Sequence, residues 1–221
     1  MDWFPLWNSL RISAIGTIIT FAAGIAAAYY VMRLPRALKG ICDTILTVPM
    51  VLPPTVVGYF ILVTVSPKSA LGTWLHDWFG VTVTMRWQAS VIAVVIVTFP
   101  LMYRTVRGAF ESFDKNLTDA GQTLGLSNTY IFTRILIPNC KSGILAGTVL
   151  AFARGLGEYG ATSMVSGYIA GRTATISTSV AYFWQINQDK MAFYWVVINL
   201  AISLIVLFAL NAFEKNRRRA R

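Results

Sequence analysis

Two oppositely charged residues, Arg154 and Glu158, lie four positions apart in the apolar run LAFARGLGEYGAT. This spacing places them on one face of a helix, where they can form an ion pair. An ionisable side chain inside a bilayer is costly, so such residues usually face the interior of a helix bundle or a water-filled path. The pattern predicts either the border of a polar path or a structural ion pair that fixes helix packing, and the residues leave both interpretations open.

The other reactive side chains give no sign of catalysis. The sequence contains no GxxxxGK[ST] phosphate-binding motif, no nucleophile–base constellation and no metal-binding cluster. The one histidine, His76, lies in a mixed loop without a second ligand, and Cys42 and Cys140 fit no metal spacing. Both cysteines fall in loops that we expect in the cytoplasm, where a disulfide is not favoured. We therefore predict that the chain is not an enzyme and binds no cofactor of its own.

The most polar, turn-rich passage is DAGQTLGLSNTYIFTRILIP, residues 119–138. Asp119 can cap a short helix over residues 120–124, and Gly125 can end it. Ser127 and Asn128 can then start a second helix that reaches Pro138. The pattern predicts a structured helix–turn–helix loop between two long hydrophobic segments.

A second irregular passage, VPMVLPPTVVG, carries Pro49, Pro53 and Pro54 within six residues, followed by Gly58. Proline removes a backbone donor and clashes with the preceding turn. Backbone that is broken at membrane depth is tolerated only where protein or a water-filled cavity covers it. We predict a break in the helix here, which either lines a pore or forms a packed kink.

The bulk composition indicates the class of protein that must position these residues. Of the 221 residues, 56% are hydrophobic and only 13% are charged, which is too apolar for an ordinary soluble domain. Apolar runs near 20 residues have the length that a bilayer demands. We predict an all-α polytopic membrane protein, one domain over residues 1–221, with about five spans: 12–32, 44–65, 89–103, 143–165 and 193–213. A sixth span within 166–184 stays open, although Arg172 and many Ser and Thr residues argue against a full crossing.

The positive charges predict the orientation of these spans, and their position beside apolar segments argues against nucleic-acid binding despite a net charge of +10. The loop after the first span, the loop around Asp119 and the tail hold 13 Lys and Arg residues: Arg33, Arg36, Lys39, Arg104, Arg107, Lys115, Arg134, Lys141, Lys215, Arg217, Arg218, Arg219 and Arg221. The opposite side holds five: Arg11, Lys68, Arg86, Arg172 and Lys190. The positive-inside rule then places the N-terminus outside and the C-terminus in the cytoplasm.

The passage 119–138 resembles the cytoplasmic loop of ABC importer permeases, whose pattern is E-A-A-x3-G-x9-I-x-L-P. Here it reads Asp-Ala-Gly at 119–121, Gly125, Ile135, then Ile137-Pro138, with the register intact. Asp replaces Glu, Gly replaces the second Ala and Ile replaces Leu. The resemblance implies a cytoplasmic coupling loop, residues 108–141, whose short helix docks into a groove on an ATPase subunit. The coupling residues that it implies are Asp119, Ala120, Gly121, Leu124, Gly125, Ile135 and Pro138.

Nearly the whole chain is similar to the permease subunits of molybdate importers, with tungstate and sulfate permeases as relatives. The similarity rests on LAFARGLGEYGAT and VPMVLPPTVVGY, and on DWFG at 77–80 and FPLMYR at 99–104. It implies a type I ABC importer permease fold in the cell membrane, a permease homodimer, two cytoplasmic ATPase subunits that use ATP and Mg²⁺, and an external oxyanion-binding protein.

The same resemblance implies that Pro53, Pro54, Thr55, Arg154 and Glu158 line the translocation path or its gate. We add a hypothesis from side-chain chemistry: the hydroxyls of Thr55, Thr162 and Ser163 donate hydrogen bonds to a passing oxyanion. Molybdate or tungstate is the expected cargo, and sulfate or thiosulfate is the alternative.

Two other classes of protein fit the sequence less well. A carrier driven by an ion gradient would need coupling residues inside its spans and usually inverted repeats. The spans offer only Arg154 and Glu158, and the sequence shows no repeat. A membrane scaffold without transport would leave the coupling-loop pattern unexplained.

Overall fold

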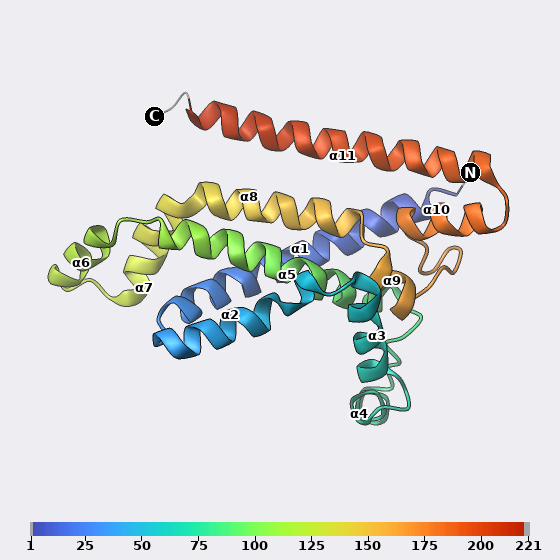
Figure 1. Cartoon of the computed structure of the whole chain (residues 1–221), viewed down its shortest axis with the longest axis horizontal. Coiled ribbons are helices and arrows are strands. Elements are labelled where there is room, and N and C mark those ends of the chain that lie inside the picture. The colour runs from blue at the N-terminus through green and yellow to red at the C-terminus, as the bar shows by residue number, and fades with distance from the viewer. Residues whose placement is uncertain (1, 219–221) are drawn as a thin grey trace.

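The computed structural model describes the backbone of residues 2–218 and the side chains of residues 2–208. Those residues form a helical bundle without a β-strand. Four segments are long and apolar enough to cross a membrane: Phe4–Met32 (α1), Trp87–Glu111 (α5), Asn128–Leu156 (α7, η1 and α8) and Asp189–Phe208 within α11 (Asp189–Arg218). Figure 1 shows α1, α5, α8 and α11 running along the long axis of the molecule.

Small residues bring α1 and α5 into close contact at the centre of the bundle. A Cβ atom on Gly16 would lie 2.7 Å from Val94 Cγ1, and one on Gly24 would lie 2.7 Å from Met102 Cγ. Between these two contacts the hydroxyls of Thr20 and Thr98 share a buried hydrogen bond of 3.2 Å. Close backbone approach and interhelical hydrogen bonds are the means by which helices associate in a bilayer.

The predicted break in the second span is confirmed. Helix α2 (Arg36–Val51) and helix α3 (Pro54–Val65) pass the span criteria together but meet at an angle of 108°. Leu52 lies between them in an extended conformation, because a residue before proline is driven out of the helical region. Pro49, by contrast, stays inside the last turn of α2. The break therefore comes from Pro53 and Pro54 rather than from all three prolines.

Several predicted boundaries were wrong. Helix α1 begins at Phe4 rather than 12, α2 begins at Arg36 rather than 44, and α5 continues to Glu111 rather than ending at 103. The added turns contain charged residues, such as Arg11 in α1, Lys39 in α2 and Arg107 in α5, which interrupt an apolar run without ending a helix. The loop 66–87 also contains a helix, α4 (Ala70–Phe79), which Ser69 caps by accepting a hydrogen bond from Gly72 N.

The count of about five spans is confirmed, since the structure has four span-length helices and one bent pair. Within 166–184 it contains most of α10 (Ile176–Gln185), whose ten residues are about half the length that a bilayer requires. The described residues therefore contain no sixth span. In the basic tail, Lys215 to Arg218 continue α11, while Arg219 and Arg221 lie outside the described residues.

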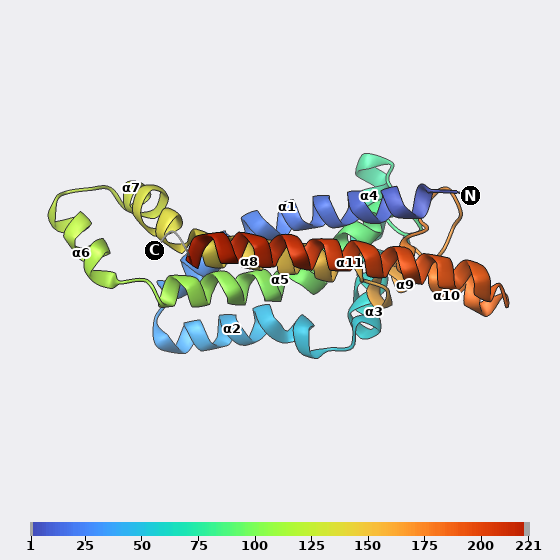
Figure 2. The same ribbon diagram turned by 90° about the horizontal axis from the view of Figure 1, so that it is seen from above.

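The connections gather at two ends of the bundle (Figures 1 and 2). One end carries the α1–α2 turn, α6 (Lys115–Thr123), α7 (Asn128–Tyr130) and the C-terminal end of α11. The other end carries the N-terminus, α3, α4, α9 (Gly160–Val165) and α10. The sequence groups that the charge pattern assigned to one side of the membrane thus lie together.

Candidate functional site

The first short helix of the coupling loop, residues 108–141, ends at the predicted turn but does not begin at the predicted residue. Helix α6 begins at Lys115, after Asp114 Oδ1 accepts a hydrogen bond of 3.0 Å from Asn116 N. Asp119 is therefore not the cap but an exposed residue in the middle of the helix. Gly125 ends the helix with φ +75°, and Leu126 N donates to Gly121 O at 3.0 Å, which is a Schellman termination.

The second helix of the loop starts where predicted, because Ser127 Oγ accepts a hydrogen bond from Tyr130 N at 3.2 Å. It does not end at Pro138, however, and continues as one segment to Leu156. Residues Ile131–Leu136 form a π-helix, η1, in which Ile137 N donates to Phe132 O. Pro138 has no N–H for the carbonyl four residues earlier, and the wider turn accommodates that loss.

Helix α6 packs on η1 through Gly121, which is buried. A Cβ atom there would lie 3.2 Å from Ile131 Cγ1 and 3.4 Å from Ile135 Cδ1, so a larger residue would lift the helix. Two apolar side chains beside this contact stay exposed: Leu117 is 46% exposed and Leu124 is 78% exposed. A short helix that is held through a buried glycine and leaves leucine side chains uncovered next to it has the form of a docking surface.

The two irregular passages of the sequence meet in space, at the contact between α3 and α9. A Cβ atom on Gly58 would lie 2.7 Å from Ala161 Cα and 2.9 Å from its carbonyl oxygen. One on Gly160 would lie 2.9 Å from Pro54 Cβ and 3.1 Å from Thr55 N. The structure thus brings Pro54 and Thr55 against the segment that follows Glu158, with backbone packed directly on backbone.

The predicted ion pair is present, although the helix around it is not continuous. Helix α8 (Ile137–Leu156) ends before Glu158, so the fourth predicted span, 143–165, is broken at Gly157. Arg154 Nη1 lies 2.7 Å from Glu158 Oε2, and the glutamate side chain is only 1% exposed. Glu158 Oε1 also accepts a hydrogen bond of 2.8 Å from Ala161 N. The carboxylate therefore joins the end of α8 to the start of α9.

The hydroxyls proposed to meet an anion are not equally accessible. Thr55 and Pro53 are exposed, and Ser163 is half-buried with its hydroxyl donating to Gly160 O at 3.0 Å. Thr162 is only 1% exposed, because it faces the packed side of α9. In this conformation Thr55 and Ser163 are open to a ligand and Thr162 is not.

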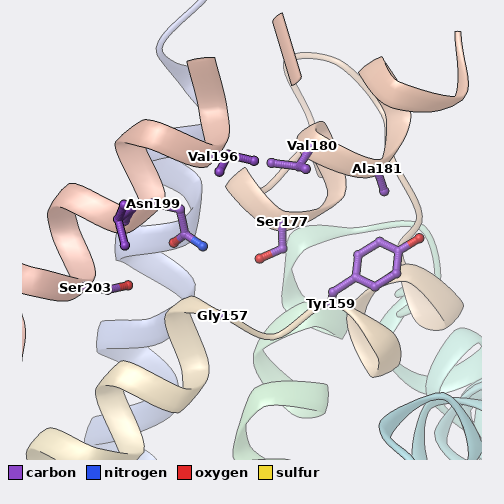
Figure 3. Close-up of a pocket in the computed structure, with 9 residues that line it drawn as sticks. Gly157, Tyr159, Ser177, Val180, Ala181, Val196, Asn199 and Ser203 are labelled. Atoms are coloured by element: carbon purple, nitrogen blue, oxygen red, sulfur yellow. The ribbon is translucent and has the colours of Figure 1, made fainter. Parts of the chain in front are cut away.

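A groove that sequence reasoning missed lies between the end of α8, α10 and α11, with a volume of about 520 Å³ (Figure 3). Its wall includes Gly157, Tyr159 and Val196, and its polar side chains are Ser177, Asn199 and Ser203. Asn199 and Ser203 lie four positions apart in the last apolar span, on one helical face. That spacing was the sequence signal that could have revealed the groove.

A smaller cavity of about 170 Å³ adjoins the groove and shares Tyr159 and Ala181 with it. Tyr168 lines this cavity and stacks on Tyr182, with ring centroids 4.0 Å apart. Burial raises the pKa of Tyr168, and the neighbouring Tyr182 adds to the effect. The Tyr168 hydroxyl therefore keeps its proton, and remains a hydrogen-bond donor, to higher pH than a free tyrosine.

A charged cluster links α2 to α5 near the end of the bundle that carries the coupling loop. Asp43 forms an ion pair with Arg107 and accepts a hydrogen bond from the Tyr103 hydroxyl. Glu111 Oε1 lies 3.0 Å from Arg107 Nε and 2.8 Å from Lys39 Nζ. The spacing of Arg107 and Glu111, four positions apart, was a local signal that the sequence analysis did not use, whereas Asp43 and Arg107 are more than 60 positions apart and give no local sign of pairing.

Comparison with known proteins places this geometry in context. The sequence profile of the family described as "Binding-protein-dependent transport system inner membrane component" matches residues 19–219. The molybdenum transport system permease protein ModB of Escherichia coli K12 is 37% identical over 207 residues, which are 93% of this chain and 90% of that protein. The putative molybdenum transport system permease protein YvgM of Bacillus subtilis is 33% identical over 92% of this chain and 90% of its own length. The sulfate transport system permease protein CysT of E. coli is 27% identical over 97% and 82%.

Solved structures resemble the fold at lower sequence identity. An inward-facing MetNI methionine ABC transporter chain matches with a TM-score of 0.75 at 14% identity, covering 98% of this chain and 97% of its own. A bacterial ABC transporter that imports the acidic polysaccharide alginate matches with a TM-score of 0.74 at 15% identity, covering 96% and 78%. At these identities the likeness concerns the fold alone.

Proposed function

The chain belongs to the family of binding-protein-dependent transport system inner membrane components, and on that premise we propose that it is the permease subunit of an ATP-driven importer of molybdate. The observation that carries this proposal is the coupling loop. Helix α6 is fixed on η1 by the buried Gly121 and presents the exposed Leu117 and Leu124 at one end of the bundle. The 37% identity to ModB, against 27% to CysT, favours molybdate over sulfate.

The proposed assembly contains two copies of this permease, two cytoplasmic ATPase subunits and an external protein that captures the oxyanion. Only 11% of the apolar window of α11 is buried within one copy, which supports further protein or lipid against that helix. The ATPase subunits supply the energy by using ATP and Mg²⁺. The permease itself contributes no hydrolytic chemistry.

In the proposed orientation the N-terminus lies outside and the C-terminus lies in the cytoplasm. The charge distribution of the sequence supports it, with 13 cationic residues on the side of the coupling loop and five on the other. The loop is then on the side of the membrane where an ATPase finds its nucleotide.

The proposed mechanism is a change between two arrangements of rigid helices. Closure of the ATPase subunits moves α6, and η1 and α8 transmit that movement to Gly157 at the far end of the segment. There, Glu158 joins α8 to α9, and α9 packs on α3 through Gly58 and Gly160. We place the gate at this contact, with Pro53, Pro54, Thr55, Arg154, Glu158, Thr162 and Ser163 around it.

Co-purification with the ATPase tests the docking assignment. We expect the wild-type permease to hold the ATPase in a 1:1 ratio, and Gly125→Trp to lose it while the spans remain inserted. The reason is that Gly125 has φ +75°, a conformation that a tryptophan adopts only with strain, so the turn behind α6 would be rebuilt. Retained ATPase in the Gly125→Trp preparation would count against docking through this loop.

Gly108→Trp is the matched control, because a Cβ atom on Gly108 meets nothing within 4 Å and its backbone is helical. That variant should keep the ATPase. Uptake of labelled molybdate by proteoliposomes, with sulfate as a competitor, then tests the substrate.

A further inference from the structure

Polar side chains converge on the groove between α8, α10 and α11 from separate elements. Figure 3 shows the Ser177 hydroxyl on α10 and the Asn199 amide on α11 pointing toward each other across the groove, with Ser203 one turn further along α11. Gly157 and Tyr159 form the wall between them and the gate. The groove therefore collects uncharged hydrogen-bonding groups from α10 and α11.

These groups are costly unless something polar occupies the groove. Between Val196 and Phe208, Asn199 and Ser203 are the only residues of α11 with an amide or hydroxyl side chain. Ser177, Asn199 and Ser203 are half-buried within one copy, and against lipid an amide or hydroxyl without a hydrogen-bond partner is unfavourable. A volume of about 520 Å³ has room for on the order of ten or more water molecules at roughly 30 Å³ each. The groove is thus large enough to be filled with water.

The groove carries no net charge of its own. Its lining contains no Lys, Arg, Asp or Glu, and the charged residues that precede and follow Gly157 in the chain, Arg154 and Glu158, form an ion pair with each other. A cationic site would bind a dianion tightly and release it slowly. Hydroxyl and amide groups would instead donate hydrogen bonds to an anion that keeps part of its water shell. Such weak binding suits an ion that must leave the groove quickly.

We infer that this groove is a transit subsite, in which Ser177, Asn199 and Ser203 donate hydrogen bonds to a hydrated tetrahedral oxyanion. The inference rests on the proposed function and adds to it a set of contact residues outside the predicted gate. Its position beside Gly157 places a bound ion next to the turn that holds α9 against α3. An ion in the groove therefore lies next to the gate on the α10–α11 side.

Molybdate uptake by proteoliposomes that contain the whole complex is the first test. Asn199→Leu should lower uptake roughly tenfold at saturating loaded binding protein, the loss expected for a hydrogen bond to a charged group. Loaded binding protein should still stimulate ATP hydrolysis by the Asn199→Leu complex. If Asn199 had only a structural role, its loss would lower ATP hydrolysis together with uptake. Thr148→Val is the matched control in α8, because Thr148 bonds only to Ile144 O of its own helix and lies outside the groove. It should import at the wild-type rate.

Two outcomes separate this inference from the proposed function. Equal uptake by Asn199→Leu and the wild type would overturn the groove and leave the importer assignment intact. A wild-type complex that imports no molybdate would instead overturn the proposed function itself.

Thiol labelling tests the groove independently of uptake, in a background where Cys42 and Cys140 are replaced by serine. Ser203→Cys should react with a water-soluble methanethiosulfonate, and molybdate should slow the reaction, because a thiolate forms in water and not in lipid. Leu204→Cys, at the next position of α11 and 45% exposed on the apolar surface, should stay unreactive. An unreactive Ser203→Cys would mean that the groove is dry and would refute the inference even if Asn199→Leu failed to assemble.

Discussion

Glycine residues set the closest helix contact in the proposed gate, and Gly58 has the least room. The nearest atoms to a Cβ on Gly58 belong to the backbone of Ala161, at 2.7 and 2.9 Å, so they cannot move aside as a flexible side chain would. Even a methyl group would therefore separate α3 from α9. The contact depends on the absence of a side chain and not on a particular one.

We predict that Gly58→Ala destabilises the purified permease by about 1–3 kcal/mol, the usual cost of overpacking a buried contact. A lower midpoint of thermal unfolding measures it. Gly40→Ala in α2 is the control, because a Cβ atom there meets nothing within 4 Å. It should be neutral or stabilising by up to about 1 kcal/mol, since alanine favours a helix over glycine. Equal midpoints for the two variants would show that α3 and α9 are not in tight contact.

At the residue scale, sequence analysis was most successful where chemistry is local. The Arg154–Glu158 pair, the Gly125 turn and the Ser127 cap follow from spacings of a few residues and are all present. The prediction that Asp119 caps the helix was wrong, because another aspartate five residues earlier, Asp114, caps the N-terminus of α6. The groove around Asn199 was missed because its walls come from three helices, and their meeting is a property of tertiary packing.

At the scale of elements, the charged cluster around Arg107 connects α5, the helix that leads into the coupling loop, to α2, the first half of the broken span. Helix α5 ends at Glu111, three residues before the Asp114 cap of α6, while α2 leads to the break at Pro53. Arg107 has contacts to carboxylates on both sides, Asp43 in α2 and Glu111 in α5. A displacement of α6 can therefore reach α2 through ion pairs as well as through packing.

We predict that Arg107→Met leaves an assembled complex that hydrolyses ATP but imports molybdate several-fold more slowly. Asp43 would keep the hydrogen bond from Tyr103 but lose its cation, and α2 would follow α5 less closely. The ratio of molybdate imported to ATP hydrolysed in proteoliposomes measures this. Arg36→Met, at the exposed start of the same α2, should keep the wild-type ratio. Parallel losses of hydrolysis and import in Arg107→Met would point to an assembly defect and contradict the coupling role.

Element boundaries show why apolar length alone predicts spans only approximately. The number of spans was correct because each needs about 20 apolar residues. The fourth span was wrong at both ends: its helix begins at Asn128, since η1 absorbs Pro138 without a break, and stops at Leu156, where glycine residues and the Glu158 contacts redirect the chain. Hydropathy does not register a π-turn or a buried carboxylate.

At the scale of the whole molecule, the orientation in the membrane gives a direct prediction. In cells whose permease lacks Cys42 and Cys140, a membrane-impermeant maleimide should label Asp77→Cys in α4 from outside. It should reach Thr123→Cys, at the end of α6, only after permeabilisation, because the two positions lie at opposite ends of the bundle (Figure 1). Both positions are exposed, so the comparison is matched. Labelling of Thr123→Cys in intact cells would place the coupling loop outside and end the importer assignment.

Helix α8 is a continuous helix of 20 residues that ends at the turn around Gly157. Figure 1 shows α7 at an angle to α8, so α8 alone forms the straight part of the segment. Its 20 residues span about 30 Å at 1.5 Å per residue. Tilting α8 by about 10° around its end at η1 would move Gly157 by roughly 5 Å, about the pitch of one helical turn. A small rotation at one end of α8 therefore becomes a displacement of several ångströms at the other end.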